Sequence, residues 1–103
     1  MAEQDGAPLV REMGCTLADF ERWLPGATRH APVVTQPDGD GVRHRITVGD
    51  GIVEIDLQPL PPRRIALFCL PVLRVTFRFP GLDQAARTAF LTHFDHYTRR
   101  GGG

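Results

Sequence analysis

The apolar residues near the start of the chain recur at the spacing of an amphipathic helix. Leu17, Phe20 and Leu24 lie at i, i+3 and i+7, so they would share one helical face. Thr16 can cap the N-terminus of this helix, and the Pro25-Gly26 pair favours its end. We therefore expect a short helix that buries its apolar face.

A second stripe of helical spacing lies near the other end of the chain. Ala86, Phe90, Phe94 and Tyr97 recur at i, i+4, i+8 and i+11, after Asp83, which can cap the helix. The stripe is continuous and largely aromatic. We expect this second helix to bury Phe90 and Phe94 against a sheet.

Between the two helices, apolar and polar residues alternate as in half-buried strands. Residues 42–48 and 52–58 alternate on either side of Gly49-Asp50-Gly51, which predicts a β-hairpin. A two-residue loop at Asp50-Gly51 keeps one face of each strand apolar, so we predict that register. Its inward pairs are Val48–Val53, Ile46–Ile55 and His44–Leu57, and on the outer face Arg45 meets Asp56.

Two more segments favour extended structure. We expect residues 32–36 to form a short strand around Val33-Val34. Residues 65–79 run extended after a stiff, proline-rich connection at 59–64. Their first half is apolar on both faces, so we expect it to be covered on both sides or to lie at the centre of the sheet. Pro71 leaves open one long bent strand or two short ones. The second half alternates, with four residues inward: Leu73, Val75, Phe77 and Phe79.

These elements predict an α+β fold in the order α-β-β-β-β-α. We expect two layers: an antiparallel sheet of three to four strands, with the N-terminal and C-terminal helices packed on one face. A single domain would span residues 15–100, after a loose N-terminal arm at 1–14 and before a flexible glycine tail at 101–103. With 103 residues, the chain can form a core without disulfides or metals.

Composition narrows the class of protein. Twelve acidic residues balance twelve arginines, so no overall charge draws the chain to nucleic acid or to a membrane. The longest apolar run, Ile65–Leu73, is far shorter than the ~20 residues that span a bilayer. Two cysteines are too few for a disulfide framework, and we expect Cys69 to be buried. No signal-peptide pattern precedes Cys15, which indicates a cytoplasmic protein, and we expect a bacterial one.

Four arginines make up the first candidate site. On the predicted strands they would all project from the outer, helix-free face of the sheet: Arg43, Arg45, Arg74 and Arg78. Forked guanidinium groups bind phosphate and carboxylate, so this face could bind an anion or RNA. Glu54 and Asp56 would project there too and weaken the field. No aromatic residue lies among them to stack on bases.

Two histidines are weak candidates for a metal site. His93 and His96 are three residues apart on the second helix and could share a face. A metal needs further ligands, and no CxxC or HExxH pattern supplies them, so we expect neither a metal nor a cofactor. Serine is absent and no nucleophile–base pattern is present, so we expect no catalysis.

The number of apolar residues favours a contact surface. Trp23, Leu60, Val72 and Leu91 are hard to bury together in one small core, so some of them would form an exposed patch. We expect a small non-enzymatic binding or accessory module that acts through protein–protein contact. Its partner would be another protein or a second copy, with no membrane involved. The alternative is an anion- or RNA-binding module that uses the arginine-lined sheet face.

Overall fold

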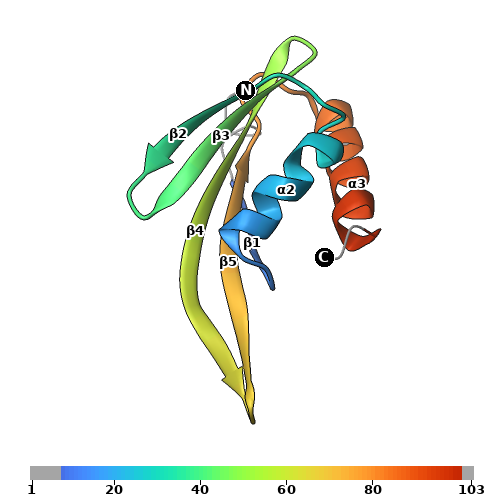
Figure 1. Cartoon of the computed structure of the whole chain (residues 1–103). Coiled ribbons are helices and arrows are strands. Elements are labelled where there is room, and N and C mark those ends of the chain that lie inside the picture. Colours follow the sequence, from blue (N-terminus) through green and yellow to red (C-terminus); the bar gives the residue numbers. More distant parts are fainter. Residues whose placement is uncertain (1–7, 101–103) are drawn as a thin grey trace.

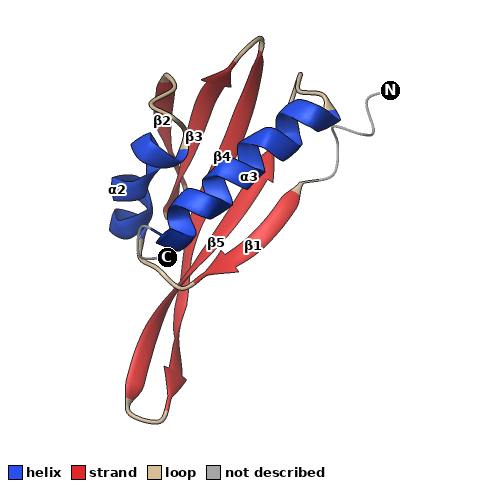
Figure 2. Ribbon diagram, turned by 90° about the vertical axis from the view of Figure 1, so that its right-hand side faces the viewer, coloured by secondary structure: helices blue, strands red, loops and turns tan. Residues whose placement is uncertain are grey.

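The computed structural model describes residues 8–100 and shows an α+β fold with five strands in one antiparallel sheet, in the order β1-β5-β4-β3-β2. Both helices lie on one face of this sheet (Figure 1, Figure 2). The two-layer prediction is therefore confirmed, with five strands in place of three to four. The elements are β1 (Leu9–Met13), α2 (Leu17–Ala27), β2 (Val33–Asp38), β3 (Gly41–Val48), β4 (Gly51–Ile65), β5 (Phe68–Arg78) and α3 (Gln84–Arg100).

The additional strand comes from the segment that we expected to be a loose arm. Within that segment β1 pairs antiparallel with β5 at one edge of the sheet. Arg11, in the middle of β1, faces the helices, where it forms an ion pair with Asp95 of α3 and lies 5.4 Å from the Phe77 ring centroid. A charged residue at an inward position breaks the apolar alternation, so the pattern gave no sign of a strand. Residues 1–7 of the predicted N-terminal segment at 1–14 and the predicted glycine tail at 101–103 lie outside the described residues.

The first helix begins as predicted and ends later. Thr16 caps it, since its Oγ1 accepts a hydrogen bond from the Asp19 N–H at 3.0 Å, and the Asp19 carboxylate accepts one from the Thr16 N–H. Pro25 lies inside α2, which continues to Ala27. Gly26 lets the second helix approach closely, because a Cβ at this position would overlap the Tyr97 ring.

The core lies between the helices and the sheet, and aromatic rings fill its centre. Phe94 of α3 is buried, with its ring edge-on to Phe77 of β5 at 5.2 Å between centroids and 5.8 Å from Phe20 of α2. The predicted burial of Phe90 and Phe94 is therefore confirmed. The inward positions of the central strands are also buried as predicted: Ile46, Val53, Ile55, Leu57, Leu73, Val75, Phe77 and Phe79.

The β3–β4 hairpin has the predicted faces but not the predicted partners. Val48 pairs with Gly51 and Ile46 pairs with Val53, which makes Gly49-Asp50 the two-residue loop. The pairing differs from our register by two residues, and a two-residue shift leaves every side chain on its own face. Gly49 takes a positive φ of 58°, as glycine does in the first loop position of a type II′ turn. Gly51 instead packs beneath Leu82, where a Cβ would overlap that side chain.

Residues 59–72 depart most from the prediction. The proline-rich segment is no connection, because β4 runs through it to Ile65, and a turn at Ala66-Leu67 leads back into β5. From the Leu60–Val72 pair to the turn at Ala66-Leu67, β4 and β5 pair only with each other. We call residues 60–72 the arm. It projects beyond both helices (Figure 1, Figure 2) and gives the molecule principal dimensions of 47 × 26 × 22 Å.

The predicted burial of the apolar run is therefore wrong. The first half of residues 65–79 is neither at the centre of the sheet nor covered on both sides, and Cys69 is exposed. Ala66 allows the reversal by adopting a positive φ of 54°, which a residue with a Cβ takes rarely. Among the described residues, no helix has the length and apolar character to cross a bilayer.

Candidate functional site

The four candidate arginines do share the outer face of the sheet, but three of them are paired with acids of β4. Asp56 accepts hydrogen bonds from Arg43 Nε and from Arg78 Nη1, each at 2.6 Å. Arg45 Nε lies 3.3 Å from a Glu54 carboxylate oxygen. Arg74 is exposed and forms no ion pair with another residue of the described chain.

The acids remove most of the positive field that an anion would need. Partial burial disfavours the charged form of Asp56, yet the hydrogen bonds from Arg43 and Arg78 hold its pKa below the ordinary 3.8. Asp38 lies 3.8 Å from Arg43, and Glu12 lies opposite Arg74 in the register. Three carboxylates, those of Asp38, Glu54 and Asp56, thus pair with arginines of this set, while Glu12 pairs with Arg63. The face is a salt-bridged surface rather than a one-sided basic patch.

Within the described part of the chain, the two candidate metal-ligating histidines gain no third ligand. His93 Nε2 donates a hydrogen bond to the carbonyl oxygen of Gly26 at 3.0 Å, which ties α3 to the end of α2. His96 lies on the exposed side of α3. Between residues 8 and 100, no three His, Cys, Asp or Glu side chains come close enough to hold a metal ion.

His44 makes the buried polar contact that its inward position predicts. The Thr35 hydroxyl lies 2.8 Å from His44 Nδ1, and a Glu21 carboxylate oxygen lies 3.5 Å from Nε2. Burial lowers the pKa of His44 below its ordinary value of 6.5, although the Glu21 carboxylate opposes this shift. The ring joins β2, β3 and α2 and is part of the framework.

The arm carries the largest group of exposed apolar side chains. Leu67 at the turn is fully exposed (100%), Phe68 is 68% exposed and Ile65 is 53% exposed. Ile65 pairs with Phe68 and Arg63 pairs with Leu70, so these four residues share one face of the ribbon. Arg64 and Cys69 occupy the other face. We name the apolar side chains of this face, together with Leu67 at the turn, the arm strip: Leu60, Ile65, Leu67, Phe68, Leu70 and Val72.

The sequence held one signal for the arm that our prediction did not use. Pro59, Pro61 and Pro62 stand directly before the apolar run, and proline is excluded from central strands because it cannot donate to the ladder. That composition favours an edge or a two-stranded ribbon.

The four apolar residues that we expected to be hard to bury together are not all exposed. Trp23 is buried, while Leu60, Val72 and Leu91 are half-buried.

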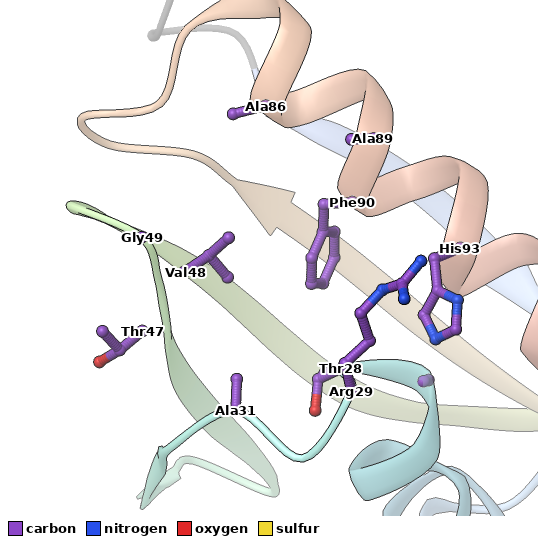
Figure 3. Close-up of a pocket in the computed structure, with 11 residues that line it drawn as sticks. Thr28, Arg29, Ala31, Thr47, Val48, Gly49, Ala86, Ala89, Phe90 and His93 are labelled. Carbon is purple, nitrogen blue, oxygen red and sulfur yellow. The ribbon is translucent and has the colours of Figure 1, made fainter.

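A second candidate site is a cavity of about 450 Å³ that the sequence did not predict. It opens between the end of α2, the end of β3 and the first half of α3 (Figure 3). Phe90 and Val48 form apolar walls, and Arg29 and His93 supply the ionisable groups. Arg29 and His30 both adopt positive φ, at 57° and 60°. Nothing in a sequence marks an arginine for this conformation, so the site could not be found from the pattern.

Comparison with known proteins gives no relative: no family model matches the chain, and neither the curated proteins nor the solved structures contain a significant match.

Proposed function

We propose that this chain is a small non-enzymatic binding module that acts through protein–protein contact, and that the arm strip is its contact surface. The observation that carries the proposal is the exposure of Ile65, Leu67 and Phe68 together at the end of a projecting ribbon. Contiguous exposed apolar patches mark interaction sites, because single scattered apolar residues are common on surfaces but clusters are not.

The ribbon itself gives a second reason for a partner. A two-stranded hairpin on its own is marginally stable in water, and the arm has neither a third strand nor a helix over it. Covering one of its faces would supply the apolar contacts that the rest of the sheet receives from α2 and α3. The arm strip is the face with the side chains to do this.

The proposed partner is a second copy of the chain, with two arm strips facing each other about a two-fold axis. Arg63 is the charged residue on the strip face, and Glu12 of the same chain already holds it at 3.4 Å. Two identical strips can therefore meet without placing unpaired like charges together. The net formal charge of zero also means that whole copies do not repel each other.

The proposal places the protein in the cytoplasm. Cys15 and Cys69 are both free thiols, and Cys69 is exposed on the arm, on the face opposite the arm strip. A reducing compartment would keep two copies from becoming linked through this residue.

The test is the oligomeric state over a range of concentrations, measured by sedimentation velocity. We expect the parent chain to change from monomer to dimer as its concentration rises. The double variant Leu67→Asp, Phe68→Asp should stay monomeric, because each dimer would bury four carboxylates. Val34→Asp is the matched control, since Val34 is an exposed apolar residue on β2, outside the arm, and it should behave as the parent does.

Two results would overturn the proposal. One is a parent chain that stays monomeric at all concentrations, and the other is an arm variant that dimerises as well as the control. Flotation with phosphatidylcholine vesicles separates a further case. A monomeric parent that floats with vesicles, and loses this behaviour in the arm variant, would assign the strip to lipid instead.

A further inference from the structure

We propose that the cavity between α2, β3 and α3 binds a small carboxylate with an apolar body, and that Arg29 holds the carboxylate. This site is separate from the arm, because its β3 residues adjoin the start of β4, whereas the arm forms the far end of that strand. The inference therefore stands apart from the proposed dimer.

The size and walls of the cavity suit a small organic molecule. Its volume of about 450 Å³ falls within the roughly 300–1,000 Å³ of ligand pockets. Phe90 and Ala89 of α3 line one side, and Val48 of β3 with Ala31 lines the other (Figure 3). Such surroundings accept an alkyl or aromatic body and offer few hydrogen bonds to water.

The charge of the cavity sets the class of ligand. Arg29 is the cationic residue among the eleven that line it, and none of the eleven is acidic. No carboxylate in residues 8–100 pairs with Arg29. A guanidinium group offers two parallel N–H donors that match the two oxygens of a carboxylate. The complementary occupant is therefore an anion of that shape.

The backbone holds Arg29 at this site in a conformation that glycine would adopt more readily. Arg29 and His30 both have positive φ. Two hydrogen bonds close the turn: the Arg29 N–H donates to the carbonyl oxygen of Gly26 at 3.3 Å, and the His30 N–H donates to that of Pro25 at 2.7 Å. Strained residues of this kind collect at ligand sites, where the position of a side chain matters more than local stability.

His93 completes the polar end of the cavity. Its Nε2 donates to the carbonyl oxygen of Gly26, which fixes the imidazole ring on the wall. Figure 3 shows the Arg29 side chain reaching toward this ring. A carboxylate held by Arg29 would lie beside the imidazole, with its apolar body directed past Phe90.

The experiment is a titration followed by amide chemical shifts in two-dimensional NMR. The probe is hexanoate, and hexanol and hexylammonium serve as controls with the same alkyl body. We expect saturable shifts at Ala31, Val48 and Ala89 with hexanoate, with a dissociation constant on the order of 1 mM for so small a ligand. Hexylammonium should cause no saturable shift, and hexanol should bind more weakly.

Two variants test the role of Arg29. Arg29→Gln should weaken hexanoate binding by about tenfold or more, because a charge-assisted hydrogen bond is lost. Arg64→Gln makes the same charge change on the exposed arm and should leave binding unchanged. The spectrum of each variant shows whether it is folded.

Three outcomes would overturn the inference. These are equal binding of hexanoate and hexylammonium, equal binding by Arg29→Gln and the parent, and hexanoate shifts that occur at Phe68 and Leu70 in place of the cavity residues. The last outcome would place the apolar probe on the arm strip.

Discussion

Strands β4 and β5 pass through two regions with opposite surroundings. In the body of the protein, where α2 and α3 cover the sheet, Leu73 of β5 is completely buried (0% exposed). In the arm, six residues earlier on the same hairpin, Leu67 is completely exposed. Leucine has the same intrinsic hydrophobicity in both places. The difference shows that burial depends on whether another element covers the strand, and not on the apolar character of the strand itself.

The two regions should therefore differ in how they contribute to stability. The body buries interlocking aromatic rings, while the arm has cross-strand contacts and the exposed ion pair of Arg63 with Glu12. Regions with few buried apolar contacts open locally at a free energy below that of global unfolding. A substitution in the arm should leave the unfolding of the body almost unchanged, whereas one in the core should affect the whole domain.

The largest expected effect comes from a matched pair of phenylalanine truncations. Phe94→Ala removes a buried ring from between Phe20 and Phe77 and should lower the free energy of unfolding by about 3–5 kcal/mol. Phe68→Ala, on the arm, should change it by no more than about 0.5 kcal/mol. The measurement is urea unfolding at a concentration where the chain is monomeric. Similar losses for both variants would contradict the contrast between body and arm.

The sequence predicted the body much better than the arm. Both helices, the inward residues of the central strands and the two-layer fold follow from apolar spacing, because each of these elements has one covered face. The arm lacks a covered face, so the rule that an apolar run is buried failed at residues 65–70. The reversal at Ala66 was also hidden, since alanine at positive φ carries no turn signal.

The hairpin register could have been predicted by a second criterion. Two registers that differ by two residues place the same side chains on the buried face, so burial of apolar residues does not distinguish them. Opposite charges do: the observed register sets Arg45 against Glu54 and Arg43 against Asp56, whereas the predicted one makes a single such pair. The cavity is a different case. It depends on a left-handed Arg29 and on how α3 crosses the sheet, and neither is encoded in local spacing.

The next prediction compares the two ends of β4. Gly51→Val, at the start of the strand in the body, should cost about 1–3 kcal/mol because the new side chain overlaps Leu82. Ile65→Val, at the end of the strand in the arm, should cost less than about 0.5 kcal/mol. Urea midpoints of both variants give the comparison. An unchanged midpoint for Gly51→Val would show that Leu82 does not pack on the start of β4.

The stability of the body should depend on pH, whereas the arm should not respond to pH in the same range. The pKa of His44 is lowered by burial, so the unfolded chain takes up its proton more readily than the folded one. The contribution of His44 to the free energy of unfolding should thus be fully present above pH 6.5. It should be lost as the pH falls from that value toward the lower pKa that His44 has in the folded state. The pKa of Asp56 is also lowered, which predicts a separate loss of stability below its ordinary 3.8.

Urea unfolding at pH 7.5 and pH 5.5 tests the contribution of His44. His44→Gln should make the loss between these two values smaller, because the imidazole that the unfolded chain protonates more readily is gone. Residues 60–72 contain no Asp, Glu or His, so the association of two arms should not change over this interval. The same pH loss in parent and His44→Gln would show that the buried imidazole does not govern this step.

The smallest expected effect concerns the arginines on the outer face of the body. Arg78 is paired with Asp56, and Arg74 is exposed without an ion pair to the described residues. Arg74→Ala should change stability by about 0.5 kcal/mol or less, because Arg74 is exposed. Arg78→Ala should cost about 1 kcal/mol or less, because Asp56 is half-buried but keeps its hydrogen bonds from Arg43. The parent chain should show no specific binding of a labelled RNA oligonucleotide or of polyphosphate at physiological salt, because the acids of β4 neutralise this face. The measurement is binding at two salt concentrations, parent against the double variant. A micromolar affinity that falls steeply with salt and is lost in the double variant would establish an anion-binding face on the body, independent of the arm.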